Sequence, residues 1–174
     1  MDHVVIPLDE DHARALARVR RRAGAATTGR GHITIASFTG LDQDVALAAV
    51  RRAVAQITPF FARAHGYGFF VGEPGDANLH VPVVRDEVLG DLHASVAGGL
   101  RGSGAALAGW MADDLWSPHI TVVEGGLDGD ALAAAVAGLA RRHHPSWRLP
   151  VRCVLLVGGR DALQSEAPEV PLAG

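Results

Sequence analysis

Two short segments of the chain repeat one pattern of histidine and threonine. Residues 32–34 read His-Ile-Thr, and residues 119–121 read the same. A single His-x-Thr is an ordinary strand sequence, because β-branched residues favour strands and one histidine among them needs no special role. In a strand, residues i and i+2 point to the same face, so each histidine projects together with its threonine. The repetition therefore predicts two imidazoles and two hydroxyls that serve one small polar ligand.

Two imidazoles around one ligand suit the exchange of bonds at phosphorus. A neutral imidazole can accept a proton from the attacking water or hydroxyl, and a protonated imidazole can donate one to the leaving oxygen. The ordinary histidine pKa near ~6.5 allows both forms at neutral pH. Threonine hydroxyls can donate hydrogen bonds to the non-bridging phosphate oxygens. This chemistry makes His32 and His119 the candidate acid-base pair and Thr34 and Thr121 the candidate phosphate ligands, with no metal or other cofactor. The sequence leaves open which histidine is the acid.

The segments around the two motifs correspond in kind and order, which indicates an internal repeat over about residues 1–72 and 78–160. Each half is expected to run strand, helix, His-x-Thr strand, helix, strand. Aspartates are the candidate N-caps of the helices that follow the motifs: Asp42 or Asp44, and Asp128 or Asp130. The other expected elements are strands at 3–8, 67–72, 79–84 and 152–158 and helices from about Asp9 to Arg22 and from about Asp86 to Leu100.

This order of elements predicts an α+β fold made of one bilobal, pseudo-duplicated domain over residues 1–174. Two antiparallel sheets are expected to face a central cleft, with helices on their outer faces. Ile33 and Ile35 alternate with the motif residues of the first copy, as Ile120 and Val122 do in the second. These four side chains are expected to lie in the core, which turns the histidines and threonines toward the cleft.

Composition narrows the class of protein. The single cysteine, Cys153, excludes a disulfide framework and is expected to be a buried strand residue. No stretch approaches the ~18 apolar residues of a membrane helix, and the first residues lack the pattern of a signal peptide, so a cytoplasmic, monomeric protein is expected. The formal net charge of −3 argues against a protein that coats long nucleic acids. All sixteen basic residues are arginine.

The two segments "GHITIASF" and "SPHITVVEG" resemble the paired His-hydrophobic-Thr motifs of the two-histidine (2H) phosphoesterase superfamily. This superfamily includes bacterial 2′-5′ RNA ligases and 2′,3′-cyclic nucleotide phosphodiesterases. The resemblance extends through the order of elements to about residue 158. It implies a bilobal duplicated fold, a metal-free active site between the lobes, and cleavage of a cyclic phosphodiester to a 2′-phosphate. It also implies that His32 and His119 form the acid-base pair, with Thr34 and Thr121 on the phosphate.

One position departs from the family pattern. Members of the RNA ligase branch commonly carry arginine three residues after the second threonine, whereas this chain has Glu124 there and Ser37 at the equivalent place in the first motif. A carboxylate facing the cleft would repel an anionic substrate, although strand alternation nominally turns Glu124 away from Thr121. Three interpretations therefore stay open: a cyclic phosphodiesterase acting on nucleotides or RNA ends, a 2′-5′ RNA ligase, and a non-catalytic module that binds nucleotides or RNA ends.

Other residues are weaker candidates for substrate binding. Arg30 is two residues from His32, and Arg152 lies on an expected strand, facing either the cleft or solvent. Tyr67 and Phe69 could stack on a base, although Phe69 and its neighbour Phe70 are expected to be core residues. The arginines between residues 18 and 22 fit the C-terminal end of a helix. None of the nine histidines shows the spacing of a familiar zinc site.

Overall fold

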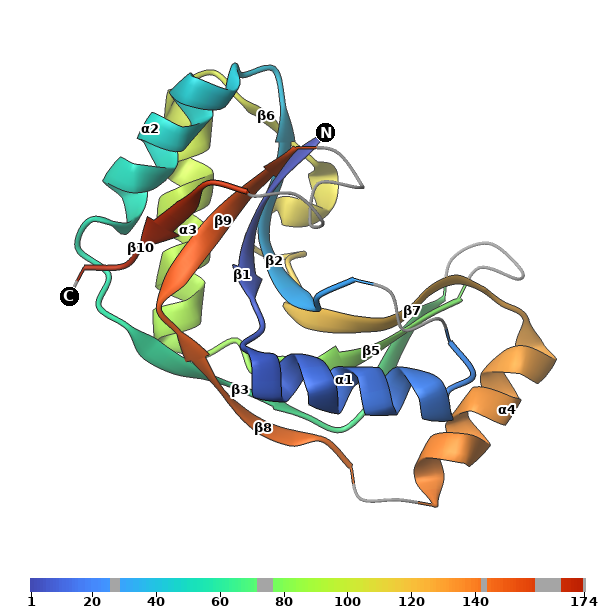
Figure 1. Ribbon diagram of the computed structural model, residues 1–174. Coiled ribbons are helices and arrows are strands. Elements are labelled where there is room, and N and C mark those ends of the chain that lie inside the picture. The colour runs from blue at the N-terminus through green and yellow to red at the C-terminus, as the bar shows by residue number, and fades with distance from the viewer. Residues whose placement is uncertain (26–28, 72–76, 142–143, 159–166, 174) are drawn as a thin grey trace.

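We describe the protein from a computed structural model (Figure 1), which covers residues 1–25, 29–71, 77–141, 144–158 and 167–173. The elements follow one another along the chain in the order β1 (Asp2–Pro7), α1 (Glu10–Arg22), β2 (His32–Thr39), α2 (Gln43–Val54), β3 (Phe60–His65), β4 (Gly68–Val71), β5 (Ala77–Pro82), α3 (Glu87–Gly102), β6 (Ala106–Leu107), η1 (Gly109–Met111), β7 (His119–Leu127), α4 (Gly129–Ala140), β8 (Ser146–Val151), β9 (Cys153–Gly158) and β10 (Glu169–Pro171).

The described strands form one sheet of five, one of three and a two-stranded ribbon. The larger sheet has the order β10-β9-β1-β2-β6, the smaller one has the order β4-β5-β7, and β3 pairs with β8. Every strand pair among the described residues is antiparallel. Figure 1 shows the two sheets diverging from the place where β2 and β7 meet. The expected α+β class is confirmed.

The helices begin at the aspartates that the sequence indicates. The carboxylates of Asp9, Asp86 and Asp128 each accept a hydrogen bond from the backbone N–H three residues later, which satisfies one of the free donors at a helix start. Asp42 occupies the same place before α2 without such a bond. The choice of Asp42 over Asp44, and of Asp128 over Asp130, is thus settled by the structure.

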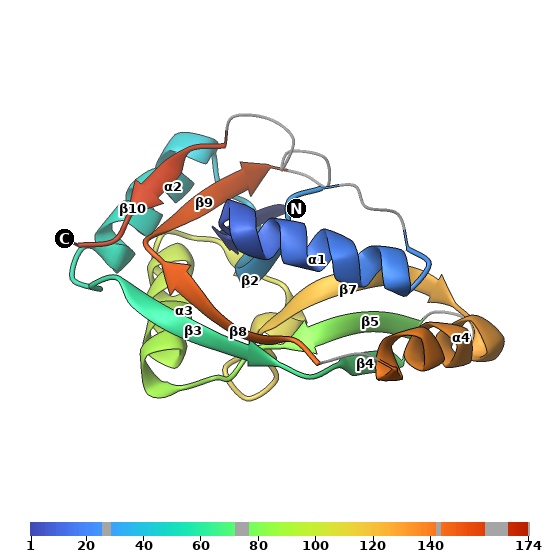
Figure 2. The same ribbon diagram turned by 60° about the horizontal axis from the view of Figure 1, so that its bottom comes forward.

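The core lies between the sheets and the helices. Ile33, Ile35 and Ile120 are fully buried, and Val122 is nearly so, as the alternation of the two motifs predicts. Helices α2 and α3 pack side by side on one flank, and α1 meets α4 at the other end of the molecule (Figures 1 and 2). Gly138 permits this second contact, because a Cβ there would lie 2.7 Å from the carbonyl oxygen of Arg22.

Two expectations about the middle of the chain were wrong or incomplete. Phe69 and Phe70 are not core residues, since 54% and 39% of their surfaces are exposed. They belong to β4, an edge strand of the three-stranded sheet, and strand edges bury less side-chain surface than central strands. The ribbon of β3 and β8 was not foreseen, because neither strand shows a continuous β-branched run.

The sheets draw their strands from both ends of the chain. In the five-stranded sheet, β9 and β10 come from the last part of the sequence and pair beside β1, which is the first strand. Likewise, β3 precedes residue 72 and β8 follows residue 145, yet they are partners. The proposed halves 1–72 and 78–160 are therefore interlaced in space, whatever their origin as a repeat.

Candidate active site

The two His-x-Thr motifs lie on β2 and β7, and these strands contact each other although they belong to different sheets. We call this region the β2–β7 junction. Trp116, just before β7, crosses it: its indole Nε1 donates a hydrogen bond of 3.1 Å to the backbone oxygen of Thr34. Trp116 is buried, so this bond is shielded from water. It holds the segment that leads into β7 against β2.

His32 is a largely desolvated imidazole. Burial, followed by the charges of His3 and His119, lowers the pKa of His32 to about 4. Arg20 contributes in the same direction, and a hydrogen bond with the backbone of Arg30 only partly opposes the shift. Two consequences follow. His32 is neutral at physiological pH, and His119 lies near enough for its charge to act on His32 directly.

The ring of His119 is oriented by its own strand. Its Nδ1 lies 2.8 Å from the backbone oxygen of Ser117, and because a carbonyl can only accept, Nδ1 carries the hydrogen. In the neutral ring the other nitrogen, Nε2, is then the one free to take up or release a proton. A backbone carbonyl two residues upstream thus selects the tautomer, a common device for histidines that exchange protons.

Arg20 connects the two motif strands from the side of α1. One terminal nitrogen of its guanidinium donates to the backbone oxygen of Gly29 at 2.9 Å, and the other donates to the backbone oxygen of Thr121 at 3.1 Å. Burial lowers the pKa of Arg20, but an arginine stays charged at any physiological pH. The junction therefore contains a fixed positive charge that also couples the segment before β2 to β7.

A third histidine accompanies His119. His80 on β5 is directly opposite Thr121 in the sheet, and its ring centroid is 5.1 Å from that of His119. Phe70 stacks on His80 at 4.2 Å and meets His119 edge-on at 5.0 Å. Burial, followed by the charge of His119, lowers the pKa of His80 to about 4. Among the described residues its buried Nδ1 has no hydrogen-bond partner, so His80 is held there as a neutral ring.

The regular alternation of side chains between the two faces is interrupted in both motif strands. The interruption lies between the threonine of each motif and the position three residues later, where the family pattern has arginine after the second motif. On β2, Thr34 pairs with Val5 but Ser37 pairs with His3, so an extra residue returns Ser37 to the face of Thr34. Ser37 Oγ and His3 Nδ1 share a hydrogen bond of 2.9 Å there. A similar register shift follows Thr121 on β7, and Glu124 is exposed. Strand parity alone therefore does not turn Glu124 away from the junction.

Among the described residues, the side chains of the three weaker candidates form no hydrogen bond, ion pair or ring contact with the four motif residues. Tyr67 meets His144 edge-on at 6.1 Å, and His144 lines a hollow together with residues of α1. Arg152 is exposed at the break between β8 and β9. Arg30 touches His32 through its backbone, whereas its charge acts on the Cys153 thiol.

Cys153 itself is half-buried. Burial, followed by the charge of Glu169, raises the pKa of its thiol to about 11, which fits the expected inert strand residue. Within the described residues, no three histidine, cysteine, aspartate or glutamate side chains are grouped so that they could hold a metal ion. No helix of the described chain is long and apolar enough to cross a membrane.

Sequence reasoning missed most of the residues that surround the motif histidines: His3, Arg20, Ser37, Phe70, His80 and Trp116. The signals were partial. His80 sits on an expected strand and alternates with Leu79 and Val81, which are buried, so its face could have been inferred. The other five residues reach the motif histidines through tertiary contacts. Such contacts produce no recognisable pattern in the local sequence.

Comparison with known proteins agrees with this arrangement. The family model of the 2′-5′ RNA ligase superfamily matches residues 7–161. Among solved structures, that of TT0787 of Thermus thermophilus has a TM-score of 0.73 at 18% identity, covering 99% of this chain and 98% of the other. A structure described as a phosphoesterase has a TM-score of 0.57 at 16% identity, covering 98% and 94%. No curated protein matches the sequence. The chain belongs to the 2′-5′ RNA ligase superfamily, within the two-histidine phosphoesterases.

Proposed function

We propose that this protein is a phosphodiesterase that opens the 2′,3′-cyclic phosphate of nucleotides or RNA ends and leaves a 2′-phosphate. The observation that carries the proposal is the meeting of His32 and His119, from strands far apart in sequence, at one junction with unequal surroundings. Two titratable groups whose environments differ are what acid-base catalysis requires. Membership in the superfamily supports phosphoester chemistry.

The unequal surroundings support a different role for each histidine. His32 is neutral in the free protein, so it acts as the base: its unprotonated nitrogen takes a proton from water as the water oxygen bonds to phosphorus. His119, with Nδ1 tied to Ser117, donates the proton of Nε2 to O3′ as the bond between phosphorus and O3′ breaks. The proton gained by His32 and the proton lost by His119 balance, and solvent restores both rings.

A base with a pKa of about 4 is weak, but a bound anionic substrate raises the pKa of His32. The cyclic phosphate is an anion, and a negative charge beside an imidazole favours its protonated form. Binding of the phosphate therefore raises the pKa of His32 toward neutrality at the moment when the proton must be accepted. Hydroxyls of Thr34 and Thr121 donate to the non-bridging oxygens, and the charge of Arg20 lies behind them at the backbone of Thr121.

The test is hydrolysis of the four nucleoside 2′,3′-cyclic monophosphates, with the product isomers separated by chromatography. Formation of 2′-phosphates by the wild type, with a loss of about 10²-fold or more in His32→Ala and in His119→Ala, supports the proposal. His65→Ala is the matched control, since His65 is exposed on β3 away from the junction. Absence of turnover on all four substrates, or activity that survives both substitutions, would reject it.

The family name favours one alternative, a 2′-5′ RNA ligase. In ligation a 5′-hydroxyl replaces water as the nucleophile that attacks the cyclic phosphate, so His32 would accept the proton of that hydroxyl and His119 would still donate a proton to O3′. Incubation of RNA fragments that carry a 2′,3′-cyclic phosphate and a 5′-hydroxyl distinguishes the two. Joined product at a yield above that of hydrolysis would favour the ligase. Tight binding without either reaction would instead indicate a binding module.

A further inference from the structure

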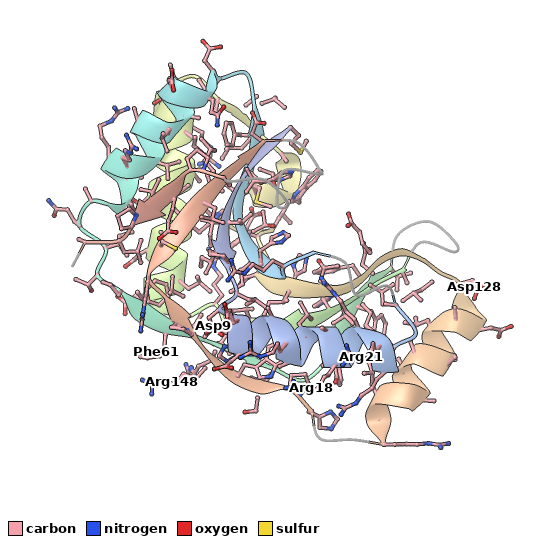
Figure 3. All side chains as sticks on the ribbon, in the orientation of Figure 1. Asp9, Arg18, Arg21, Phe61, Asp128 and Arg148 are labelled. Carbon is pink, nitrogen blue, oxygen red and sulfur yellow. The ribbon has the colours of Figure 1, made fainter. Side chains whose placement is uncertain are left out.

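A hollow of about 280 Å³ lies on the side of α1 that faces away from the β2–β7 junction. Helix α1 lines it with Ala15, Arg18, Val19 and Arg22, and the chain entering β8 lines it with residues 144–147. Arg18 is four residues before Arg22, so both point to one face of the helix, whereas Arg20 points to the opposite face and reaches Thr121. Figure 3 shows Arg18 and Arg21 along this outer part of α1.

The described residues that line this hollow carry an excess of positive charge. Among the described residues that line it, none is acidic. The carboxylates of Glu10 and Asp11 at the start of α1 are already paired with Arg14, at 3.3 Å and 2.5 Å. Asp9 is paired with His12 at 2.8 Å. Arg18 and Arg22 form no ion pair with any described carboxylate.

Helix electrostatics accounts for Arg22, which lies in the last turn of α1, but not for Arg18. The C-terminal end of a helix favours cations, but the effect falls off within the last turn, and Arg18 lies a full turn before Arg22. Two like charges at i and i+4 oppose each other and slightly destabilise the helix. Such a pair beside a hollow is the arrangement that an external anion would stabilise.

The other lining groups suit a phosphate of a nucleic-acid strand. Guanidinium groups bind phosphate oxygens through paired N–H donors. Ser146 adds a hydroxyl, and the rings of His144 and Trp147 provide flat surfaces at the same wall. Tyr67 stands beside His144 and close enough for the charge of Arg22 to act on its phenol.

We propose that the hollow between α1 and β8 is a second phosphate-binding site, which holds a phosphate of the single-stranded RNA whose cyclic end occupies the β2–β7 junction. The choice of ligand rests on the proposed function. Arg20 at the junction, Arg21 and Arg22 at the end of α1, and Arg18 in the hollow form a continuous basic path around one helix. A strand leaving the junction would follow this path.

The probe is a fluorescently labelled, single-stranded oligoribonucleotide of about ten nucleotides with a 3′-phosphate, long enough to pass around a helix about 10–12 Å wide. Its Kd is measured by anisotropy at several salt concentrations. The variant is Arg18→Ser with Arg22→Ser. The matched control is Arg51→Ser with Arg52→Ser, which removes the same charge from exposed positions near the end of α2. A nucleoside 3′-phosphate, too short to span both sites, is measured by competition.

We expect the Arg18/Arg22 variant to bind the oligonucleotide roughly tenfold more weakly or worse, as for lost charge-assisted hydrogen bonds. The slope of log K against log salt should become shallower by about 0.7, the value expected for the loss of one phosphate contact on a single strand. The control variant and the mononucleotide should change by less than about threefold.

Four results would overturn the inference: equal weakening by both double variants, no weakening by either, equal weakening for the mononucleotide, or no binding of the oligonucleotide by the wild type. A fifth result, displacement of the oligonucleotide by oligoglutamate at matched charge, would overturn it in favour of an acidic protein partner. Because anisotropy needs no turnover, a failed hydrolysis assay together with binding that depends on Arg18 and Arg22 would reject the proposed function and leave the second site standing.

Discussion

Replacement of His80 by leucine should flatten the dependence of stability on pH. Burial holds the pKa of His80 at about 4, whereas in the unfolded chain it is near 6.5. Between these two values the unfolded state binds the proton and the folded state does not. The free energy of unfolding therefore falls as the pH falls from 6.5 toward 4, and the contribution of His80 is fully present only above pH 6.5.

The magnitude follows from the two pKa values. At about pH 4.5 the linkage relation gives a loss of about 2.5 kcal/mol for this one group, relative to about pH 7.5. His80→Leu should remove that loss, so the decline between these two pH values should be smaller than in the wild type by about that amount. Changes in packing against Phe70 and His119 affect both pH values alike and cancel in the difference.

Urea unfolding at several pH values between about 4.5 and 7.5 measures the effect. His65→Leu is the control, because it makes the same substitution at an exposed position on β3. Parallel curves of stability against pH for the wild type and His80→Leu would refute the inference that His80 is buried as a neutral ring. His32, which shares the lowered pKa, should keep part of the acid sensitivity in the variant.

Three further outcomes can be checked with the same preparations. Thr34→Ala and Thr121→Ala should each lower turnover of cyclic nucleotides by about 10²–10³, as for a lost oxyanion donor, and a fall below about threefold would remove them from that role. Gly68→Ala should lower the free energy of unfolding by about 1–3 kcal/mol, because its Cβ would lie 2.6 Å from Nε2 of His80, whereas Gly129→Ala, with open space around it, should not. Excess chelator should leave the hydrolysis rate unchanged; a rate restored only by added zinc or magnesium would contradict the mechanism of two histidines.

The local parts of the fold could be predicted from sequence. Aspartates whose carboxylates accept a backbone hydrogen bond mark the starts of three helices, and the expected helix from Asp9 to Arg22 differs from α1 only by its cap. The alternation of His32 and Thr34 with two isoleucines correctly separated the core from the junction. These features depend on hydrogen bonds and burial within a few residues, so the sequence itself contains them.

The features that the sequence did not predict depend on contacts between distant segments. Phe70 looks like a core residue in any window of sequence, but it lies on an edge strand, where it covers His80 instead. The extra residue that returns Ser37 to the face of Thr34 is a property of the pairing with β1 and not of β2 alone. The approach of Arg20 to Thr121 joins positions about a hundred residues apart, and only the packing of α1 onto β7 produces it.

The interlaced sheets have a consequence for how the molecule unfolds. A cut after Val71 would leave β1, β2, β3 and β4 on one fragment and all their remaining sheet partners on the other, so that each of the three described sheets would be divided. Neither fragment alone could pair all the backbone N–H and C=O groups of its strands. The two fragments together could form all the strand pairs of the intact protein. The segments before and after Val71 should therefore unfold as one cooperative unit, and the protein is a candidate for reassembly from two separately produced fragments.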